Sequence, residues 1–130
     1  MDVRRFAQVF GAVYILVGVV GFVLTGFGGF AGSTPGGTIV LFDVNPLHNI
    51  VHLGVGAAWL ASSTRVDWAR TVSLVIGAVY LLVGVLGLFL AGDDSLNILA
   101  LNQADNLLHL VSGALALVFA LSGRRQTATA

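Results

Sequence analysis

The sequence contains no cysteine, no lysine and no glutamate, and only two prolines in 130 residues. The absence of cysteine excludes disulfides, thiolate metal sites and a cysteine nucleophile. Charged residues make up 9% of the chain, whereas a soluble domain carries about a quarter. The charges are six arginines and six aspartates, which cancel, and a nucleic-acid-binding protein needs a clustered basic face instead. The composition therefore argues against a soluble domain and against a nucleic-acid partner.

Apolar residues dominate the chain, at 57% of the sequence and a mean hydropathy of +0.96. Four apolar runs stand out, over residues 6–26, 46–61, 69–91 and 103–121. Each is close to the ~20 residues that a helix needs to cross ~30 Å of hydrocarbon, and the second is the shortest. The sequence predicts an all-α membrane protein with four transmembrane helices in a single domain over 1–130, whose partner is the lipid bilayer.

The arginines all flank the same side of these four runs. They are Arg4, Arg5, Arg65, Arg70, Arg124 and Arg125, and the two other connections contain only aspartates. Because basic loops stay on the cytoplasmic side, both termini are expected in the cytoplasm, with residues 123–130 as a cytoplasmic tail. The first run resembles a signal peptide, but its sequence recurs inside the chain, where a signal peptide cannot stand.

An internal repeat relates the two halves of the chain. Twelve of 18 aligned positions are identical between residues 9–26, VFGAVYILVGVVGFVLTG, and residues 75–92, VIGAVYLLVGVLGLFLAG. The second and fourth runs also align, as NPLHNIVHLGVGAAWL and NQADNLLHLVSGALAL. We expect a duplicated helical hairpin, with repeat 1 over about 6–64 and repeat 2 over about 69–122, related by an axis along the membrane normal. A glycine-rich loop over residues 27–44 lengthens the first half.

Small residues recur along the apolar runs at alternating spacings of three and four, which is typical of left-handed helix packing. We expect these residues to let the helices of one bundle approach closely. The predicted packing residues are Gly11, Tyr14, Gly18, Gly21, Gly56, Gly77, Tyr80, Gly84, Gly87 and Gly113.

Most of the polarity within the spans lies at the outer ends of the second and fourth. This polar cluster comprises Asn45, His48, Asn49, His52, Asn102, Asp105, Asn106 and His109. Ionisable groups in a membrane span indicate function by default, and such side chains also join helices by hydrogen bonds. Counting residues inward places Gly18 and Gly21, and likewise Gly84 and Gly87, at the depth of the histidines, so each imidazole is expected to face glycines.

Four interpretations of this cluster remain open. In the first, which the sequence favours, the side chains only hydrogen-bond between helices and no cofactor is bound. In the second, His48, His52, Asp105 and His109 bind zinc or iron, with Asn49 and Asn106 supporting the ligands. A third is haem ligation by His52 and His109. The fourth is a small transporter, although no span centre carries the acidic or basic residue that a proton relay needs.

The segment FDVNPLHNIVHLGVGAAWL, residues 42–60, resembles a bacterial family of four-helix membrane proteins, domain of unknown function 4383. Its most specific part is NPLHNIVHL, and the fourth run carries a degraded copy with Gln103 and Asp105 in place of Pro46 and His48. The resemblance covers residues 6–122 and implies a small integral membrane protein without an established activity. DoxX-like proteins are similar in architecture only.

No catalytic motif is present: the sequence has no nucleophile elbow, phosphate loop or HExxH. The expectation is therefore a structural, interaction or accessory protein of the bacterial cytoplasmic membrane rather than an enzyme. A second copy of the chain or another membrane protein would be its partner. A metal- or haem-binding redox protein is the alternative from another class, and the sequence indicates no substrate.

Overall fold

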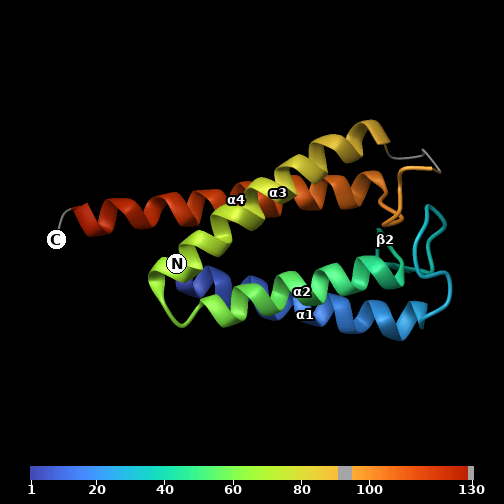
Figure 1. Ribbon diagram of the computed structural model, residues 1–130, viewed down its shortest axis with the longest axis horizontal. Coiled ribbons are helices and arrows are strands. Elements are labelled where there is room, and N and C mark those ends of the chain that lie inside the picture. Colours follow the sequence, from blue (N-terminus) through green and yellow to red (C-terminus); the bar gives the residue numbers. More distant parts are fainter. Residues whose placement is uncertain (91–94, 129–130) are drawn as a thin grey trace.

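The computed structural model describes residues 1–90 and 95–128, with side chains described to residue 122. These described residues form four helices and one pair of short strands (Figure 1). They are α1 (Val3–Thr25), β1 (Gly37–Ile39), β2 (Phe42–Val44), α2 (Pro46–Ser62), α3 (Val66–Leu90) and α4 (Gln103–Ala128). The prediction of an all-helical architecture is confirmed, with a β-hairpin added in the loop between α1 and α2.

Three helices in the described part of the chain are long and apolar enough to cross a membrane: α1, α3 and α4 over Gln103–Ser122. Helix α2 has 17 residues, which at 1.5 Å per residue is about 25 Å. It is thus shorter than the ~20 residues of a typical span, and the predicted fourth span stays a prediction. Helix α4 runs to Ala128 and so includes most of the segment expected as a tail.

The helices form two antiparallel pairs, α1 with α2 and α3 with α4, which lie side by side (Figure 1). The start of α1, the α2–α3 connection and the end of α4 lie together at one end of the molecule. The β-hairpin and the segment before α4 lie at the other end. We call the first end the arginine end and the second the hairpin end.

Glycines bring the two helices of each pair into close contact. A Cβ added at Gly11 of α1 would lie 2.8 Å from the Leu60 side chain and 2.9 Å from the Gly56 carbonyl oxygen of α2. A Cβ added at Gly77 of α3 would meet Leu117 and Gly113 of α4 at 2.9 and 3.0 Å. The packing glycines therefore act within each pair, and the same contacts occur in both.

Aromatic side chains fill the interface between the two pairs, which we call the seam, towards the arginine end. Phe6 of α1 stacks on Phe119 of α4 with ring centroids 5.0 Å apart and meets Trp59 of α2 edge-on at 5.6 Å. Tyr14 and Tyr80 face each other across the seam at 5.7 Å. The predicted packing residues thus divide by role, since the glycines join helices within a pair and the tyrosines join the pairs.

The loop between α1 and α2 contains a β-hairpin that the sequence analysis did not predict. Strands β1 and β2 are antiparallel, with Gly37 opposite Val44 and Ile39 opposite Phe42. The residues of the turn are Val40 and Leu41, and Val40 has a φ of +58°. Hairpin turns with positive φ favour asparagine or glycine, so a valine there gave no turn signal in the sequence.

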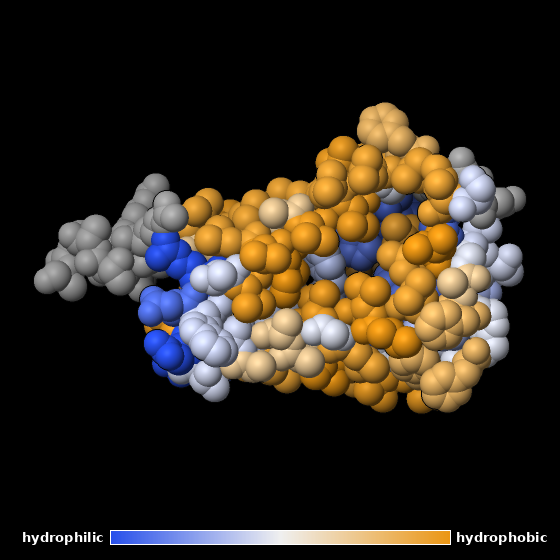
Figure 2. Space-filling model, viewed as in Figure 1, coloured by the Kyte–Doolittle hydropathy of each residue, from blue (hydrophilic) through white to orange (hydrophobic). Residues whose placement is uncertain are grey.

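Hydrophobic residues cover the middle of the molecule, and polar ones gather at its ends (Figure 2). Long runs of valine and leucine on the outer faces of the helices are exposed, as Val23 at 79% and Phe89 at 82% illustrate. Such a surface suits lipid rather than water. Polar residues also show at the bottom of a hollow within the apolar surface, towards the hairpin end (Figure 2).

Candidate functional site

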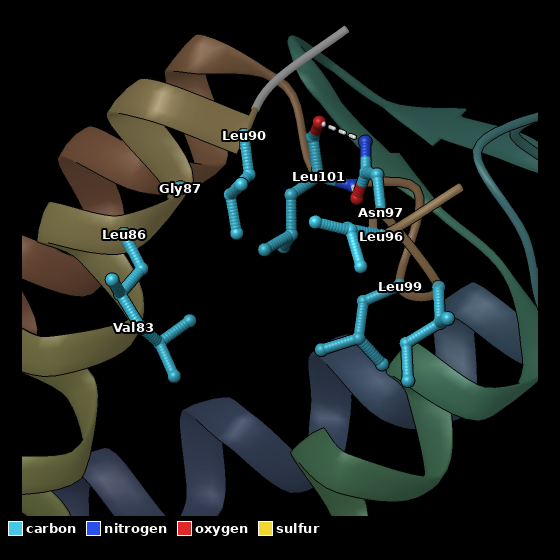
Figure 3. A pocket seen from close by; sticks show the side chains of 9 residues that line it. Val83, Leu86, Gly87, Leu90, Leu96, Asn97, Leu99 and Leu101 are labelled. Atoms are coloured by element: carbon cyan, nitrogen blue, oxygen red, sulfur yellow. Dashed lines mark hydrogen bonds between the residues drawn. The ribbon is translucent and has the colours of Figure 1, made fainter. Parts of the chain in front are cut away.

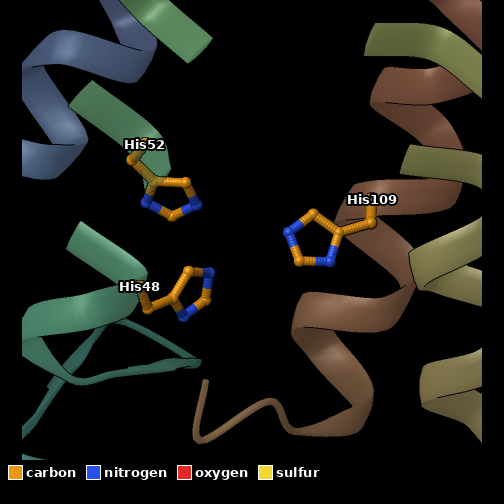
Figure 4. Close-up of side chains that lie close together, drawn as sticks. All are labelled: His48, His52 and His109. Atoms are coloured by element: carbon orange, nitrogen blue, oxygen red, sulfur yellow. The ribbon is translucent and has the colours of Figure 1, made fainter. Parts of the chain in front are cut away.

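Three histidines meet at the seam near the hairpin end (Figure 4). His48 and His52 lie one turn apart on α2, and His109 points at them from α4. One ring nitrogen of each lies within 4.8 Å of the others, and all three side chains are at most 3% exposed. The ring centroids are 4.3 Å apart for His48–His52, 5.8 Å for His48–His109 and 6.5 Å for His52–His109. We call these residues the histidine cluster.

The imidazoles of this cluster lack hydrogen-bond partners among the described residues. Both ring nitrogens of His48, both of His52 and Nδ1 of His109 are buried without one. Backbone oxygens of Asp43 and Leu99 face the His48 ring without reaching hydrogen-bond geometry. Buried polar groups are normally paired, and an unpaired one costs about 1–3 kcal/mol. Five such atoms at one place make the histidine cluster a candidate ligand site.

Two tyrosines hold the histidine rings from the arginine end. The Tyr14 ring meets His52 edge-on at 5.3 Å, and the Tyr80 ring meets His109 at 5.0 Å. The Tyr14 hydroxyl donates a hydrogen bond to Ser112 Oγ on α4 at 2.9 Å. These contacts fix two of the three imidazoles between bulky side chains, so the cluster is shielded from the arginine end.

Asp105, the fourth expected metal ligand, does not join the histidine cluster. Its carboxylate accepts a hydrogen bond from the Asn102 backbone N–H at 3.0 Å, and Asn102 Oδ1 accepts one from the Asp105 N–H at 3.0 Å. This reciprocal pair is a capping box at the start of α4. His48 stands at the same N3 position of α2, but an imidazole does not complete that cap, and its ring turns to the seam. The sequence analysis aligned the two residues correctly and overlooked the competing role of the carboxylate.

Asn45 and Asn102 tie the two pairs together at the hairpin end. Asn45 caps α2 by accepting the His48 N–H at 2.9 Å, and its amide donates to the carbonyl oxygens of Gly32 at 3.1 Å and Ile98 at 2.9 Å. Asn102 donates from its amide to the Leu41 carbonyl oxygen at 2.9 Å. Each asparagine therefore caps its own helix and bonds to the loop of the other pair.

Asn49 and Asn106 occupy the glycine faces that were expected to receive the histidines. A Cβ at Gly21 would overlap Oδ1 of Asn49, and one at Gly87 would overlap Oδ1 of Asn106. That expectation was wrong, because counting depth did not give the direction in which each side chain points. The asparagines face their own helix partner, whereas the histidines point across the seam. In the described structure neither amide hydrogen-bonds to a histidine, so neither supports a metal ligand directly.

Two cavities lie near the hairpin end, and the sequence gave no signal of either. The larger, about 270 Å³, lies between α1, α4 and the β-hairpin and reaches the ring of His52. The smaller, about 150 Å³, lies between α3 and the segment before α4, with only leucine, isoleucine, valine, glycine and one asparagine around it (Figure 3). Val17 lines the first and Val83, its counterpart in the repeat alignment, lines the second. Only the larger cavity touches the histidine cluster.

Comparison with known proteins gives one match. The family model described as Domain of unknown function (DUF4383) matches residues 4–122, which covers α2, α3, nearly all of α1, α4 as far as Ser122, and the histidine cluster. No curated protein and no solved structure matches the chain. The family assignment agrees with the resemblance found in the NPLHNIVHL segment. The chain is therefore a member of the DUF4383 family, with several apolar helices that suit a membrane and a buried histidine cluster at its seam.

Proposed function

We propose that this protein spans the bacterial cytoplasmic membrane four times and binds one divalent transition-metal ion on His48, His52 and His109. The observation that carries the proposal is the burial of five unpaired ring nitrogens from three histidines on two helices. An ion would give these nitrogens the partner that they lack. Three neutral imidazoles suit zinc or iron, and cobalt can report on the same site.

The spacing of the cluster supports one shared ion. Three nitrogens bound to one zinc at ~2.0–2.1 Å in tetrahedral geometry lie about 3.3 Å from one another. The nitrogens now lie within 4.8 Å, so closure needs a movement of about 1.5 Å or less, which side-chain rotation can supply. Three protein ligands leave a fourth position open, as catalytic zinc sites do. A porphyrin would have to separate His52 from His109, and the nearby His48 ring makes the cluster better suited to a single ion.

Metal titration of the purified protein in lipid nanodiscs tests this proposal. We expect one Zn²⁺ or Co²⁺ per chain, and His109→Ala should weaken binding about 100-fold or more, since loss of a ligand exceeds the 10- to 100-fold effects of outer-shell partners. Affinity should also fall on acidification, because the ligands must be deprotonated.

The matched control is Asp105→Asn, which replaces the carboxylate by an amide whose oxygen can still accept the Asn102 N–H. Because Asp105 caps α4 instead of facing the cluster, this variant should bind the ion within about threefold of wild type. Absence of a stoichiometric ion, or equal binding by His109→Ala, would overturn the metal site. A large loss of metal affinity in Asp105→Asn would indicate that the Asp105 carboxylate is a metal ligand.

Four spans and cytoplasmic termini are supported by the one-sided arginines and by the equivalent packing of α2 and α4 on their partners. The same contacts in both pairs also support the origin of the chain by duplication of a hairpin. Because the chain has no cysteine, single substitutions give a clean test. Thr34→Cys at the hairpin end should react with a membrane-impermeant maleimide on intact cells, and Thr64→Cys at the arginine end should not. The reverse pattern, or labelling of both, would refute this topology.

A purely structural or accessory role is the second candidate, and the asparagine ties between the pairs favour it. Hydrogen bonds between membrane helices contribute about 0.6 kcal/mol each, so these ties could hold the seam without an ion. In that case the purified protein is metal-free, and His109→Ala unfolds at nearly the wild-type temperature.

A further inference from the structure

The larger cavity is almost wholly apolar at its surface, and three polar residues stand among those that line it. Its sides are formed by Val17 of α1, Val44 of β2 and Leu108 of α4, among other apolar residues. Its polar lining consists of Tyr14, His52 and Ser112. This combination of an apolar pocket with a few convergent polar groups is typical of a small-molecule site.

The polar lining offers both a hydrogen-bond donor and an acceptor. The Ser112 oxygen receives the Tyr14 hydroxyl, which leaves the serine proton to be donated, and no described residue accepts it. Both nitrogens of His52 are buried without a partner, and a neutral imidazole accepts at one of them. Because both nitrogens of His52 are covered, its ring must turn towards the cavity before a ligand can bond to it. A single hydroxyl group could then bond to both residues, because it donates one proton and accepts another.

The volume of the cavity sets the size of its occupant. A dry apolar cavity of about 150 Å³ is enough to bind benzene, and this one is about 270 Å³. One or two aromatic rings therefore fit, with room for one hydroxyl. The smaller cavity in Figure 3 would hold a single ring but has no histidine, serine or tyrosine in its lining.

The rim of the larger cavity lies on the apolar surface of the molecule. Val13 of α1 is 48% exposed and Val40 of the β-hairpin is 86% exposed, and both line the cavity. A molecule that reaches it across these residues comes from the lipid phase. Helices α1 and α4 belong to different pairs, and no described glycine of either helix packs closely against the other.

We propose that this cavity binds an uncharged, lipid-soluble phenol of one or two rings, with its hydroxyl at His52 and Ser112. A second part of the inference rests on the proposed metal site: in the loaded protein the phenol oxygen occupies the position that the three imidazoles leave open. The cavity itself does not depend on the ion.

Thermal unfolding of the metal-free protein in nanodiscs, titrated with 1-naphthol, tests the cavity. Ligands that bind only the folded state raise the unfolding temperature in a saturable way. Val17→Phe fills the cavity from α1 and should raise the half-saturating concentration about tenfold or more. Val83→Phe makes the same change at the equivalent position of α3 and should leave the half-saturating concentration of 1-naphthol unchanged. Leu108→Phe blocks the cavity from α4 if Val17→Phe does not fold.

Naphthalene, which lacks the hydroxyl, should bind at least tenfold more weakly than 1-naphthol. A response that is not saturable, or that is equal in Val17→Phe and Val83→Phe, would overturn the cavity as a site. The visible bands of the Co²⁺-loaded protein should shift with the same half-saturation. Naphthol binding without any Co²⁺ binding would refute the proposed metal site and support the cavity as a ligand site. Co²⁺ binding without a naphthol response would support the metal site and refute the cavity as a ligand site.

Discussion

Replacing Gly87 by alanine tests whether glycine faces hold the buried asparagines. An added Cβ would overlap Oδ1 of Asn106 and lie 2.6 Å from its Cγ and 3.0 Å from its Nδ2. Asn106 is fully buried, with its amide 3.5 Å from the Gln103 side-chain oxygen. The Asn106 amide must therefore leave its position, or α3 and α4 must separate.

The magnitude follows from two opposing terms. Alanine is favoured over glycine in a helix by up to about 1 kcal/mol, and an extra methyl in a packed interior costs about 1–3 kcal/mol. Gly54→Ala on α2 is the matched control, because a Cβ at Gly54 meets nothing within 4 Å. The propensity term is common to both variants, so Gly87→Ala should be less stable than Gly54→Ala by about 1–3 kcal/mol.

Equilibrium unfolding in mixed micelles, followed by circular dichroism, measures both free energies of unfolding. The double variant Gly87→Ala with Asn106→Ala should recover more than half of the loss, because the overlapping amide is gone. The reasoning is refuted if Gly87→Ala and Gly54→Ala agree within about 0.5 kcal/mol, the usual error of additivity, or if the second substitution restores nothing.

Two further predictions concern helix starts. Asn45→Ala removes the cap of α2 and two hydrogen bonds to loop carbonyls. It should lower the free energy of unfolding by about 1–2 kcal/mol for the cap and about 0.6 kcal/mol for each of these hydrogen bonds. A loss below 0.5 kcal/mol in the same unfolding assay would count against this prediction. The backbone N–H of Arg5 lowers the pKa of the Asp2 carboxyl below its usual 3.8, so this cap stabilises α1 above that pH and is lost as the pH falls through the lowered pKa. Carboxyl-carbon NMR of Asp2 should give a midpoint below 3.8, and a midpoint at or above it would contradict the cap.

The helices could be predicted because each element carries its own signal. Hydropathy located the start of each helix to within three residues but ended the fourth run at 121, short of Ala128. Asparagine at 45 and 102 stands where helix caps are expected. The family resemblance rested on a nine-residue segment and agrees with the match over residues 4–122. The span status of α2 could not be decided by this route, since 17 residues fall at the margin of the membrane thickness.

The details of the site depended on the direction in which each side chain points, and residue counting does not give that direction. Counting residues put Gly21 near the depth of His52, and the packing of the pairs decided that Asn49 turns to Gly21 while His52 turns to the seam. Asp105 had two uses open to it, and the local capping box satisfies the carboxylate without a distant partner. The β-hairpin and the larger cavity arise from loop geometry and from the fit between pairs, which no short motif records.

The histidine cluster draws its members from both halves of the chain, and this affects how the protein is made. The first pair supplies His48 and His52 as soon as α2 has been synthesised, but His109 follows only with the last helix. A chain truncated before α4 has two of the three imidazoles. A chain whose two pairs lie apart has all three, but they do not meet at one place. An ion bound by all three would thus bind only after α4 has packed against α2. Its occupancy would report the fraction of completely folded chains rather than the fraction of helices inserted into the membrane.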